Sequence, residues 1–421
     1  MGRMMNEGIL ADVPGIKMPD LFELTDDLKH VLSVLNASGF GTWVVGGAVR
    51  DSIIGIEPHE FDVATDAIPD EIIESFEDTI PTGIKYGTIT VKTGNSQFEV
   101  TTLRSERGYG DGRRPDEVEW GKSLAVDLSR RDFTMNAMAY DYARGLLHDP
   151  FHGRQDLENG MLRAVGEAQH RLSEDGLRIM RAYRFMDRGE AGIWAPDEPL
   201  SAALIDNRAM LSKVSVERIW NELSRICTGL NGGVVLARMN RDGILLTIVK
   251  AVISLNSFEQ ISLMKQDLEA RLALLLQDQD HNEIETILKT LKAPSKIIQR
   301  VKHLHFLVHN TPKETELRLY RAVIGNEVPT HVELMYCTSQ DSKLIKKSMI
   351  YPTDIDCLVD GEWIMKRTGL TAGIKLGRLK EWLHRIQIER GLSNKDDIEN
   401  VLCTIPWQHG DPKEWPRVKW P

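Results

Sequence analysis

The feature that most constrains the fold of this chain is a change in its hydrophobic pattern near residue 155. Before that point, short runs of β-forming residues alternate with helical segments, and the stretch GTITVKTGNSQFEVTTLR has the alternation of a hairpin that turns at Gly94-Asn95. After it, long amphipathic stretches dominate, at 170–187, 214–229, 257–276, 282–292, 295–308, 314–324 and 373–390. The pattern predicts an α+β fold, in which a domain with a small, mixed and largely antiparallel sheet precedes an α-helical remainder.

The composition excludes several classes of protein. No apolar run reaches the ~20 residues of a membrane span, and the N-terminal stretch MGRMMNEGILADVPGIKMPD lacks the apolar core of a signal peptide. The cysteines form no CxxC pair, so we expect neither a zinc site nor a disulfide framework, and a cytoplasmic location. The net charge of -10 argues against a protein that simply coats nucleic acid, but it is compatible with a local basic groove.

Two acidic residues follow a Gly-Gly pair at a short distance in the predicted sheet domain. The apolar run TWVV leads into Gly46-Gly47, where a turn from strand to helix leaves backbone N–H groups free to cradle phosphate oxygens. In the next predicted strand, Glu60 and Asp62 stand two residues apart and would share a face. Two carboxylates so close repel each other unless a cation lies between them, and Mg²⁺ prefers such hard oxygen ligands. A solvated pair at a sheet edge is the alternative.

Glu99, in the second strand of the predicted hairpin, is a candidate for a third carboxylate on the same face. A cross-strand partner for Arg104 is the equally weighted alternative.

The stretch SRRDFTMNAMAYD combines charged residues with an apolar segment. Arg130 and Arg131 are suited to neutralising a triphosphate, while Asp132 and Asn136 offer hydrogen bonds to a sugar or to the arginines. Such a cluster is usually a set of surface ion pairs, but the apolar residues that follow place it at the border of a core.

The stretch RLSEDGLRIMRAYRF places charges at helical spacing. On one helix, Asp175, Arg178, Arg181 and Arg184 would lie broadly on one side. A solvated, salt-bridged helix is one interpretation, and recognition of a base is the other. A carboxylate accepts from the exocyclic amino group of cytosine or adenine, and a guanidinium donates to the neighbouring ring nitrogen.

Together these motifs carry a resemblance to a known family. GGAVRD, HEFDVAT, FEVTTLR, RRDFTMNAMA and EDGLRIMRAYRF occur in this order over about residues 40–230. The order resembles that of the class II tRNA nucleotidyltransferases, or CCA-adding enzymes, and of the related bacterial poly(A) polymerases. The resemblance implies a polymerase-β-like nucleotidyltransferase head followed by an α-helical neck, body and tail. The expected bounds are 1–155 for the head, 156–230 for the neck, 231–310 for the body and 311–421 for the tRNA-binding tail.

The same resemblance implies transfer of CMP and AMP from CTP and ATP to the 3′ end of tRNA, with release of pyrophosphate. It implies a metal site at Glu60 and Asp62, with Glu99 as a further catalytic residue. It implies nucleotide contacts by Gly46, Gly47, Arg50, Arg131, Asp132, Asn136, Arg181 and Arg184, and base selection by Asp175 and Arg178. The stretch 213–226 is similar to the next motif of the family. The expected partners are tRNA, CTP and ATP, without DNA or membrane, and the protein is a monomer or a homodimer.

Glu60 departs from the Asp-x-Asp pattern of this family. Mg²⁺ is the expected cofactor. Because the extra methylene of Glu60 shifts its carboxylate, Mn²⁺, which tolerates less ideal geometry, is the alternative. A poly(A) polymerase, an enzyme restricted to A addition, and an RNA-binding relative impaired by Glu60 are the competing functions. Complete CCA addition is favoured over CC addition alone because the loop SERGYGDGRRPDEVEWGKSLAVD has full length.

Overall fold

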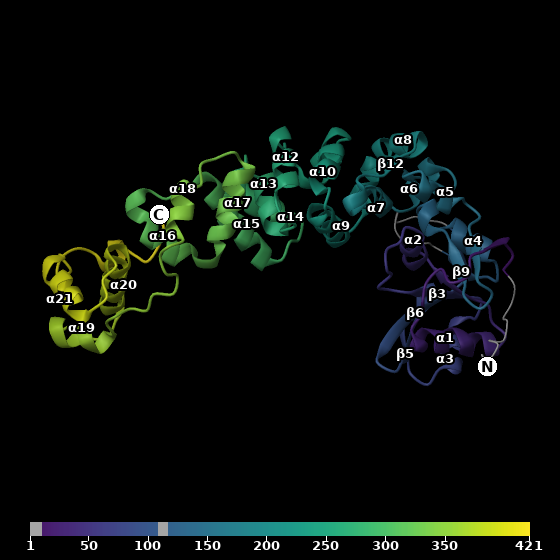
Figure 1. The fold of residues 1–421 in the computed structure, drawn as a ribbon, viewed down its shortest axis with the longest axis horizontal. Coiled ribbons are helices and arrows are strands. Elements are labelled where there is room, and N and C mark those ends of the chain that lie inside the picture. The colour runs from purple at the N-terminus through teal and green to yellow at the C-terminus, as the bar shows by residue number, and fades with distance from the viewer. Residues whose placement is uncertain (1–10, 108–116) are drawn as a thin grey trace. The chain divides into compact units, whose positions relative to one another are not determined.

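The computed structural model describes residues 11–107 and 117–421 (Figure 1). Contacts between residues divide the chain into two compact units. Unit 1 is Met1–Val252 with Thr290–Lys292, and unit 2 is Ile253–Lys289 with Ala293–Pro421. The predicted bounds at 155, 230 and 310 stay predictions.

Unit 1 contains a sheet of eight strands among the described residues, in the order β1-β10-β9-β2-β3-β6-β5-β4. Only the β3–β6 pair in this sheet is parallel, which confirms the predicted mixed, largely antiparallel sheet. Smaller ladders join β7 to β8 and β11 to β12. The strands are β1 (Gly15–Lys17), β2 (Thr42–Val45), β3 (Asp62–Thr65), β4 (Thr79–Gly83), β5 (Thr88–Thr93), β6 (Ser96–Thr102), β7 (Arg104–Arg107), β8 (Glu117–Trp120), β9 (Ala139–Asp141), β10 (Leu146–His148), β11 (Met161–Leu162) and β12 (Ala195–Pro196).

The hairpin of β5 and β6 forms where it is predicted. Thr93 pairs with Ser96 across the turn, and Gly94 adopts a φ of 57°, a backbone conformation that glycine tolerates best. Buried apolar residues of β2 and β3 pack with residues that follow the hairpin in one core cluster. It includes Trp43, Ala64 and Leu103. The sheet is therefore fixed by both its turn chemistry and its buried face.

Helices α1 (Asp26–Ala37) and α3 (Pro69–Ser75) pack on β5, beside which Figure 1 shows them. Helix α1 begins after Thr25, whose hydroxyl oxygen accepts the N–H of Leu28. The other helices of unit 1 are α2 (Gly47–Ile53), α4 (Leu124–Ser129), α5 (Gly153–Glu158), α6 (Ala168–Glu174), α7 (Leu177–Met186), α8 (Glu198–Asp206), α9 (Val216–Thr228), α10 (Gly232–Arg241) and α11 (Ile244–Val249), with short 3₁₀ turns η2 (Thr134–Asn136) and η4 (Arg208–Lys213).

The single helix predicted over 170–187 is wrong, because the chain breaks between α6 and α7. Asp175 is extended, with φ -140° and ψ 109°, and its carboxylate accepts the N–H of Leu177. Gly176 lies against η4 so closely that a Cβ there would stand 2.5 Å from the carbonyl oxygen of Met210. The glycine is thus required by close packing, and the break turns Asp175 into a residue of the junction rather than of a helix face.

Unit 2 is helical over its described residues. The stretch predicted as one helix over 257–276 is two helices, because Asp267 starts a new helix by accepting the N–H of Ala270. Buried Arg271 donates to the carbonyl oxygens of Met264 and Lys265 at the break. The helices are α12 (Leu255–Leu263), α13 (Leu268–Leu275), α14 (His281–Thr290), α15 (Ser295–His309), α16 (Leu317–Ile324), α17 (Val328–Cys337), α18 (Lys343–Ser348), α19 (Gly361–Thr368), α20 (Ile374–Arg390) and α21 (Lys395–Thr404).

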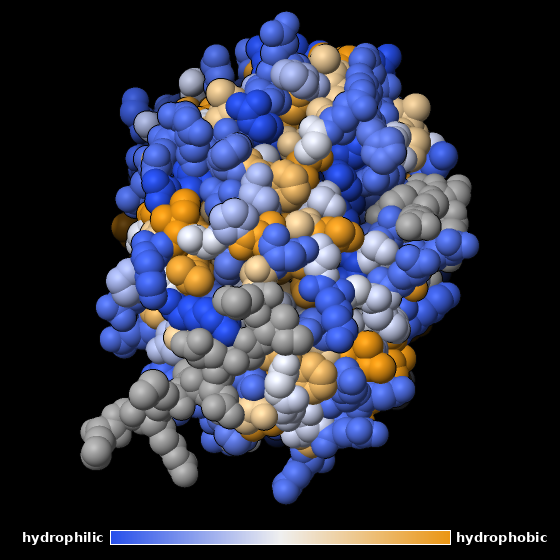
Figure 2. Space-filling view, turned by 90° about the vertical axis from the view of Figure 1, so that its right-hand side faces the viewer, coloured by the Kyte–Doolittle hydropathy of each residue, from blue (hydrophilic) through white to orange (hydrophobic). Residues whose placement is uncertain are grey.

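The face of the molecule in Figure 2 is mostly hydrophilic, with small apolar patches scattered among polar side chains. Within the part of the chain that the structure describes, every helix is too short or too polar to cross a membrane.

Candidate active site

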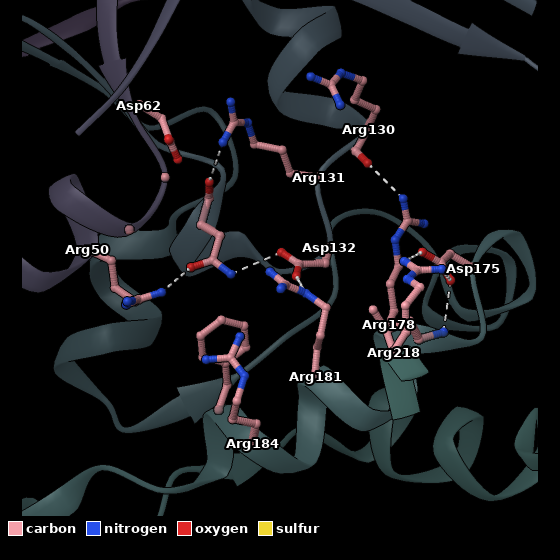
Figure 3. Close-up of a pocket in the computed structure, with 15 residues that line it drawn as sticks. Arg50, Asp62, Arg130, Arg131, Asp132, Asp175, Arg178, Arg181, Arg184 and Arg218 are labelled. Atoms are coloured by element: carbon pink, nitrogen blue, oxygen red, sulfur yellow. Dashed lines mark hydrogen bonds and ion pairs between the residues drawn. The ribbon is translucent and has the colours of Figure 1, made fainter. Parts of the chain in front are cut away.

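A polar pocket of about 500 Å³ lies in unit 1, where the β2–α2 turn, the start of β3, the segment after α4 and the α6–α7 junction meet (Figure 3). It contains Asp62 and all the residues predicted to bind the nucleotide. Glu60 and Glu99 are not among the described residues that line it. The lining residues are Gly46, Gly47, Arg50, Asp62, Arg130, Arg131, Asp132, Asn136, Asp175, Leu177, Arg178, Arg181, Arg184, Phe185 and Arg218.

Gly46 forms the turn between β2 and α2 with a φ of 72°, which favours glycine. A Cβ at this position would lie 3.2 Å from Nη1 of Arg131, so the glycine also lets the arginine reach the pocket. The N–H of Gly46 donates to the carbonyl oxygen of Met138 at 3.4 Å. This bond takes the Gly46 N–H out of the predicted phosphate cradle.

Of the three predicted carboxylates, only Asp62 lines the pocket, at the start of β3. Glu60 is exposed and lies two residues before β3, so the prediction that it shares a strand face with Asp62 is wrong. Asp62 stands instead in register with Glu99 on the parallel strand β6, which places these two on one sheet face. The predicted alternative partner of Glu99 is also wrong, because Nε of Arg104 contacts Oε1 of Glu106 at 2.7 Å.

These carboxylates influence each other electrostatically. Asp62 is exposed at the start of β3, yet partial desolvation of its carboxyl, opposed by Arg131 and reinforced by Glu60, raises its pKa. Burial together with the charges of Asp62 and Glu60 raises the pKa of Glu99. We call Glu60, Asp62 and Glu99 the carboxylate edge.

Opposite this edge, a chain of hydrogen bonds joins α2 to α7. Nη1 of Arg50 donates to Oδ1 of Asn136 at 2.8 Å, and Nδ2 of Asn136 donates to Oδ1 of Asp132 at 3.0 Å. Nε of Arg181 donates to Oδ2 of Asp132 at 2.7 Å. Arg181 and the hydrogen bonds around Asp132 hold the pKa of this buried carboxyl below its usual value, against the effect of burial. Both ends of the chain are therefore fixed before any nucleotide arrives.

Two further acidic residues hold arginines of the pocket. Asp127 in α4 is buried, and its Oδ1 and Oδ2 contact Arg130 at 2.7 Å and Arg131 at 3.3 Å. Glu222 in α9 is also buried and accepts from Nε of Arg184 at 2.6 Å. We call Arg50, Arg131, Arg181 and Arg184, with the side chains that hold them, the arginine wall.

The α6–α7 junction presents Asp175 and Arg178 to the pocket (Figure 3). Oδ2 of Asp175 contacts Nη2 of Arg218, from α9, at 2.9 Å. Arg178 is buried, contacts Glu174, and donates to the carbonyl oxygens of Arg171 and Arg130 at 2.7 and 3.1 Å. The solvated, salt-bridged helix, one of the two interpretations of this stretch, is therefore wrong: Asp175 and Arg178 are anchored separately, by Arg218 and by Glu174.

Comparison with known proteins identifies the family. A family model for the poly(A) polymerase head domain matches residues 42–163. The CCA-adding enzyme of Lactobacillus helveticus is 32% identical over 400 residues, which cover 92% of this chain and 98% of that protein. The chain belongs to the CCA-adding enzymes.

Solved structures of CCA-adding enzymes share the fold. The Bacillus stearothermophilus CCA-adding enzyme in complex with CTP matches with a TM-score of 0.76 and 24% identity, covering 90% of this chain and 97% of that one. The Thermotoga maritima CCA-adding enzyme complexed with tRNA matches with a TM-score of 0.69 and 20% identity, covering 93% and 99%. These matches confirm the polymerase-β-like head and helical remainder as the fold class.

As a CCA-adding enzyme the chain is a tRNA nucleotidyltransferase, and its family implies dependence on a divalent metal ion. Asp62 fits such an ion, because it lines the pocket with hard oxygen donors and its pKa is raised beside the charge of Glu60. Within residues 11–107 and 117–421, no three His, Cys, Asp or Glu side chains are grouped to hold a metal by themselves.

Sequence reasoning left out several side chains of this CCA-adding enzyme's pocket. Arg218 lies in the stretch 213–226, whose resemblance to a family motif was the available signal. Asp127 stands three and four residues before Arg130 and Arg131, a helical spacing that was an available signal. Glu222 looks like an ordinary helix acid in the sequence, and only the fold brings it to Arg184. Residues 108–116, part of the loop used to favour complete CCA addition, lie outside the described residues.

Proposed function

We propose that this chain adds CMP, CMP and AMP in turn to the 3′ end of tRNA, using CTP and ATP. In each step the tRNA 3′-hydroxyl oxygen bonds to the α-phosphorus of the nucleotide, the bond from that phosphorus to the bridging oxygen breaks, and pyrophosphate leaves. One observation carries the proposal: a single pocket brings together Asp62, the arginine wall and an Asp/Arg pair able to select a base. The location that suits this activity is the cytoplasm.

The carboxylate edge would hold the metal, for which we propose Mg²⁺, with Mn²⁺ as the ion that better tolerates the Glu60 geometry. A bound cation of this kind lowers the pKa of an attacking hydroxyl and offsets charge on the leaving pyrophosphate. Asp62 is the central ligand, because it lines the pocket and stands in register with Glu99. Glu60 adds negative charge near it, and the charges of Asp62 and Glu60 both act on Glu99.

The arginine wall would bind the triphosphate. Its guanidiniums are held by Asn136, Asp127, Asp132 and Glu222, so their orientation is set in the free enzyme. Preorganised donors need little reorganisation when charge develops on the leaving group, which is why such an arrangement favours phosphoryl transfer.

Asp175 and Arg178 would read the base. The Asp175 carboxylate would accept from the amino group of cytosine or adenine, and Arg178 would donate to the adjacent ring nitrogen. Arg178 has N–H groups available to donate to the base. A guanidinium has five N–H groups, and the contacts of Arg178 with Glu174, Arg171 and Arg130 use only part of them. Uracil and guanine present a carbonyl where Asp175 requires a donor, so they would be rejected.

The test is an extension assay with a tRNA that ends before CCA, labelled CTP and ATP, and either Mg²⁺ or Mn²⁺. We expect three added nucleotides and then a stop, and no extension of a tRNA that already ends in CCA. Absence of extension with both metals, alongside retained tRNA binding, would overturn the proposal in favour of an RNA-binding protein. Long A tails from ATP alone would show a poly(A) polymerase, and A addition only to tRNA ending in CC would show the A-restricted enzyme.

A further inference from the structure

Phe185, near the end of α7, carries an arrangement that neither the sequence motifs nor the hydrogen bonds explain. Its side chain lines the pocket yet the residue is only 8% exposed. Three guanidiniums lie over its ring: the Cζ of Arg184 is 4.1 Å from the ring centroid, that of Arg50 is 5.1 Å away and that of Arg181 is 5.2 Å away. All three distances are within the range of cation–π attraction.

Arg181 and Arg184 lie one turn apart on α7, the helix of Phe185 itself, and Arg50 comes from α2. The three positive charges would repel one another without compensation. Each has an acidic contact, to Asp51 for Arg50, Asp132 for Arg181 and Glu222 for Arg184. Burial, reinforced by Arg181 and opposed by Glu222, lowers the pKa of Arg184.

An aromatic ring compensates charge differently from a carboxylate. The face of the ring is electronegative and attracts a cation, but it does not accept hydrogen bonds in the strong way that a carboxylate does. Guanidiniums stacked on the ring therefore keep N–H groups available for phosphate oxygens. The ring also packs against Phe133, whose centroid lies 5.8 Å away in a T-shaped arrangement.

We propose that Phe185 is a positioning residue for the triphosphate: its ring holds Arg50, Arg181 and Arg184 at the spacing in which they bind the phosphates of CTP and ATP. This inference rests on the proposed function. It adds a contribution to nucleotide affinity that does not depend on the base and comes from a side chain that touches no reacting atom. Its signature follows from that role. Loss of the ring must weaken both nucleotides equally and leave the choice between CTP and UTP unchanged.

The first test replaces Phe185 by Leu and by Tyr and measures CTP and ATP affinity by calorimetry without tRNA. We expect Phe185→Leu to raise both dissociation constants about tenfold, and Phe185→Tyr to keep them near the wild-type values. In the extension assay the KM values should rise with the dissociation constants, while kcat falls less.

The second test changes only the electrostatics of the ring. Mono-, di- and trifluorinated phenylalanine at position 185 withdraw electron density stepwise with little change in shape, so nucleotide affinity should fall stepwise. Thermal unfolding of each variant shows whether the fold is kept. The matched control is Tyr351→Leu, which removes the stacking of Arg318 at 4.5 Å in unit 2 and should leave CTP affinity unchanged.

The outcomes separate this inference from the proposed function. Equal affinity across the fluorinated series, with a loss only in Phe185→Leu, would overturn it, because packing alone would then explain the residue. A change in CTP over UTP selectivity would overturn it as well. If the wild-type protein fails to extend tRNA, the proposed function fails, but the binding series still decides the role of Phe185.

Discussion

The carboxylate edge and the arginine wall differ in how their charges are compensated. On the carboxylate edge, Asp62 and Glu99 are paired in register on neighbouring strands, and Glu60 adds a third negative charge. On the arginine wall, by contrast, opposite charges are paired: buried Asp127 contacts Arg130 and Arg131, and buried Asp132 contacts Arg181. The pKa is accordingly raised for Asp62 and Glu99 and lowered for Asp127 and Asp132.

The difference shows which charges the chain compensates with its own side chains and which are left for a bound cation to compensate. The guanidiniums of the wall are held by acids and by Asn136 in the free protein, with Nε of Arg131 as their one buried nitrogen left without a partner among the described residues, as suits the binding of a polyanion by preorganised donors. The edge holds carboxylates together at a cost in stability, a situation typical of sites that await a cation. The wall should therefore govern nucleotide affinity and the edge should govern turnover.

The largest expected effect comes from removing the central charge of the edge. Asp62→Asn should reduce kcat for CMP addition about 10³-fold, because the metal loses its main ligand. The measurement is single-turnover tRNA extension. Asp70→Asn, an exposed acid in α3, is the charge-matched control and should keep wild-type turnover. A fall of less than about tenfold in Asp62→Asn would remove this residue from the chemistry.

On the wall, Asp132→Asn leaves Arg181 without its buried partner. We expect a loss of about 3 kcal/mol in the free energy of unfolding. The pKa of Asp132 is lowered in the folded state, so its contribution to stability is present above the unfolded pKa and is lost as the pH falls through the folded pKa. Denaturant unfolding between neutral and acid pH should therefore show the difference between wild type and variant shrinking as the solution is acidified.

The matched control for this variant is Asp141→Asn, which breaks another buried Asp–Arg pair, to Arg144 at 2.7 Å, outside the pocket. Both variants should lose stability, but only Asp132→Asn should weaken CTP binding. Equal CTP affinity in the two would show that the order of the wall does not matter for the nucleotide.

A smaller effect is expected at the α6–α7 junction, where Arg218 holds Asp175. Arg218→Gln should lower the selectivity for CTP over UTP about tenfold, because the carboxylate that accepts from the amino group loses its orientation. Competition between labelled CTP and UTP measures this ratio. Arg225→Gln, exposed on the same helix, is the control. Unchanged selectivity would limit Arg218 to a structural role.

The smallest effect is expected from Glu60→Asp, which restores the family pattern. Since Glu60 is exposed and lies before β3, we expect only a few-fold rise in the ratio of Mg²⁺- to Mn²⁺-supported activity. Extension assays with each metal, with Glu57→Asp as the control, measure the ratio. A fall in the ratio would show that the longer side chain is adapted to Mg²⁺ here.

The sequence predicted much of the pocket because short motifs carry it. The strand, Gly46-Gly47 turn and following helix are local features, and the hairpin that places Glu99 follows from its turn residues. The break at Asp175 was missed because the apolar periodicity of Leu172, Ile179 and Met180 continues across it, while the packing that requires Gly176 comes from η4. Arg218 could not be placed either, since its partner is 43 residues away in sequence.

The most direct measurement is CTP affinity in the presence of a metal chelator, for wild type, Asp62→Asn and Asp132→Asn. Without metal, the carboxylate at 62 only repels the triphosphate, whereas the wall attracts it. The division of labour between edge and wall predicts that Asp62→Asn binds CTP at least as tightly as wild type and that Asp132→Asn binds it more weakly. Loss of CTP binding in Asp62→Asn, with unchanged binding in Asp132→Asn, would contradict it.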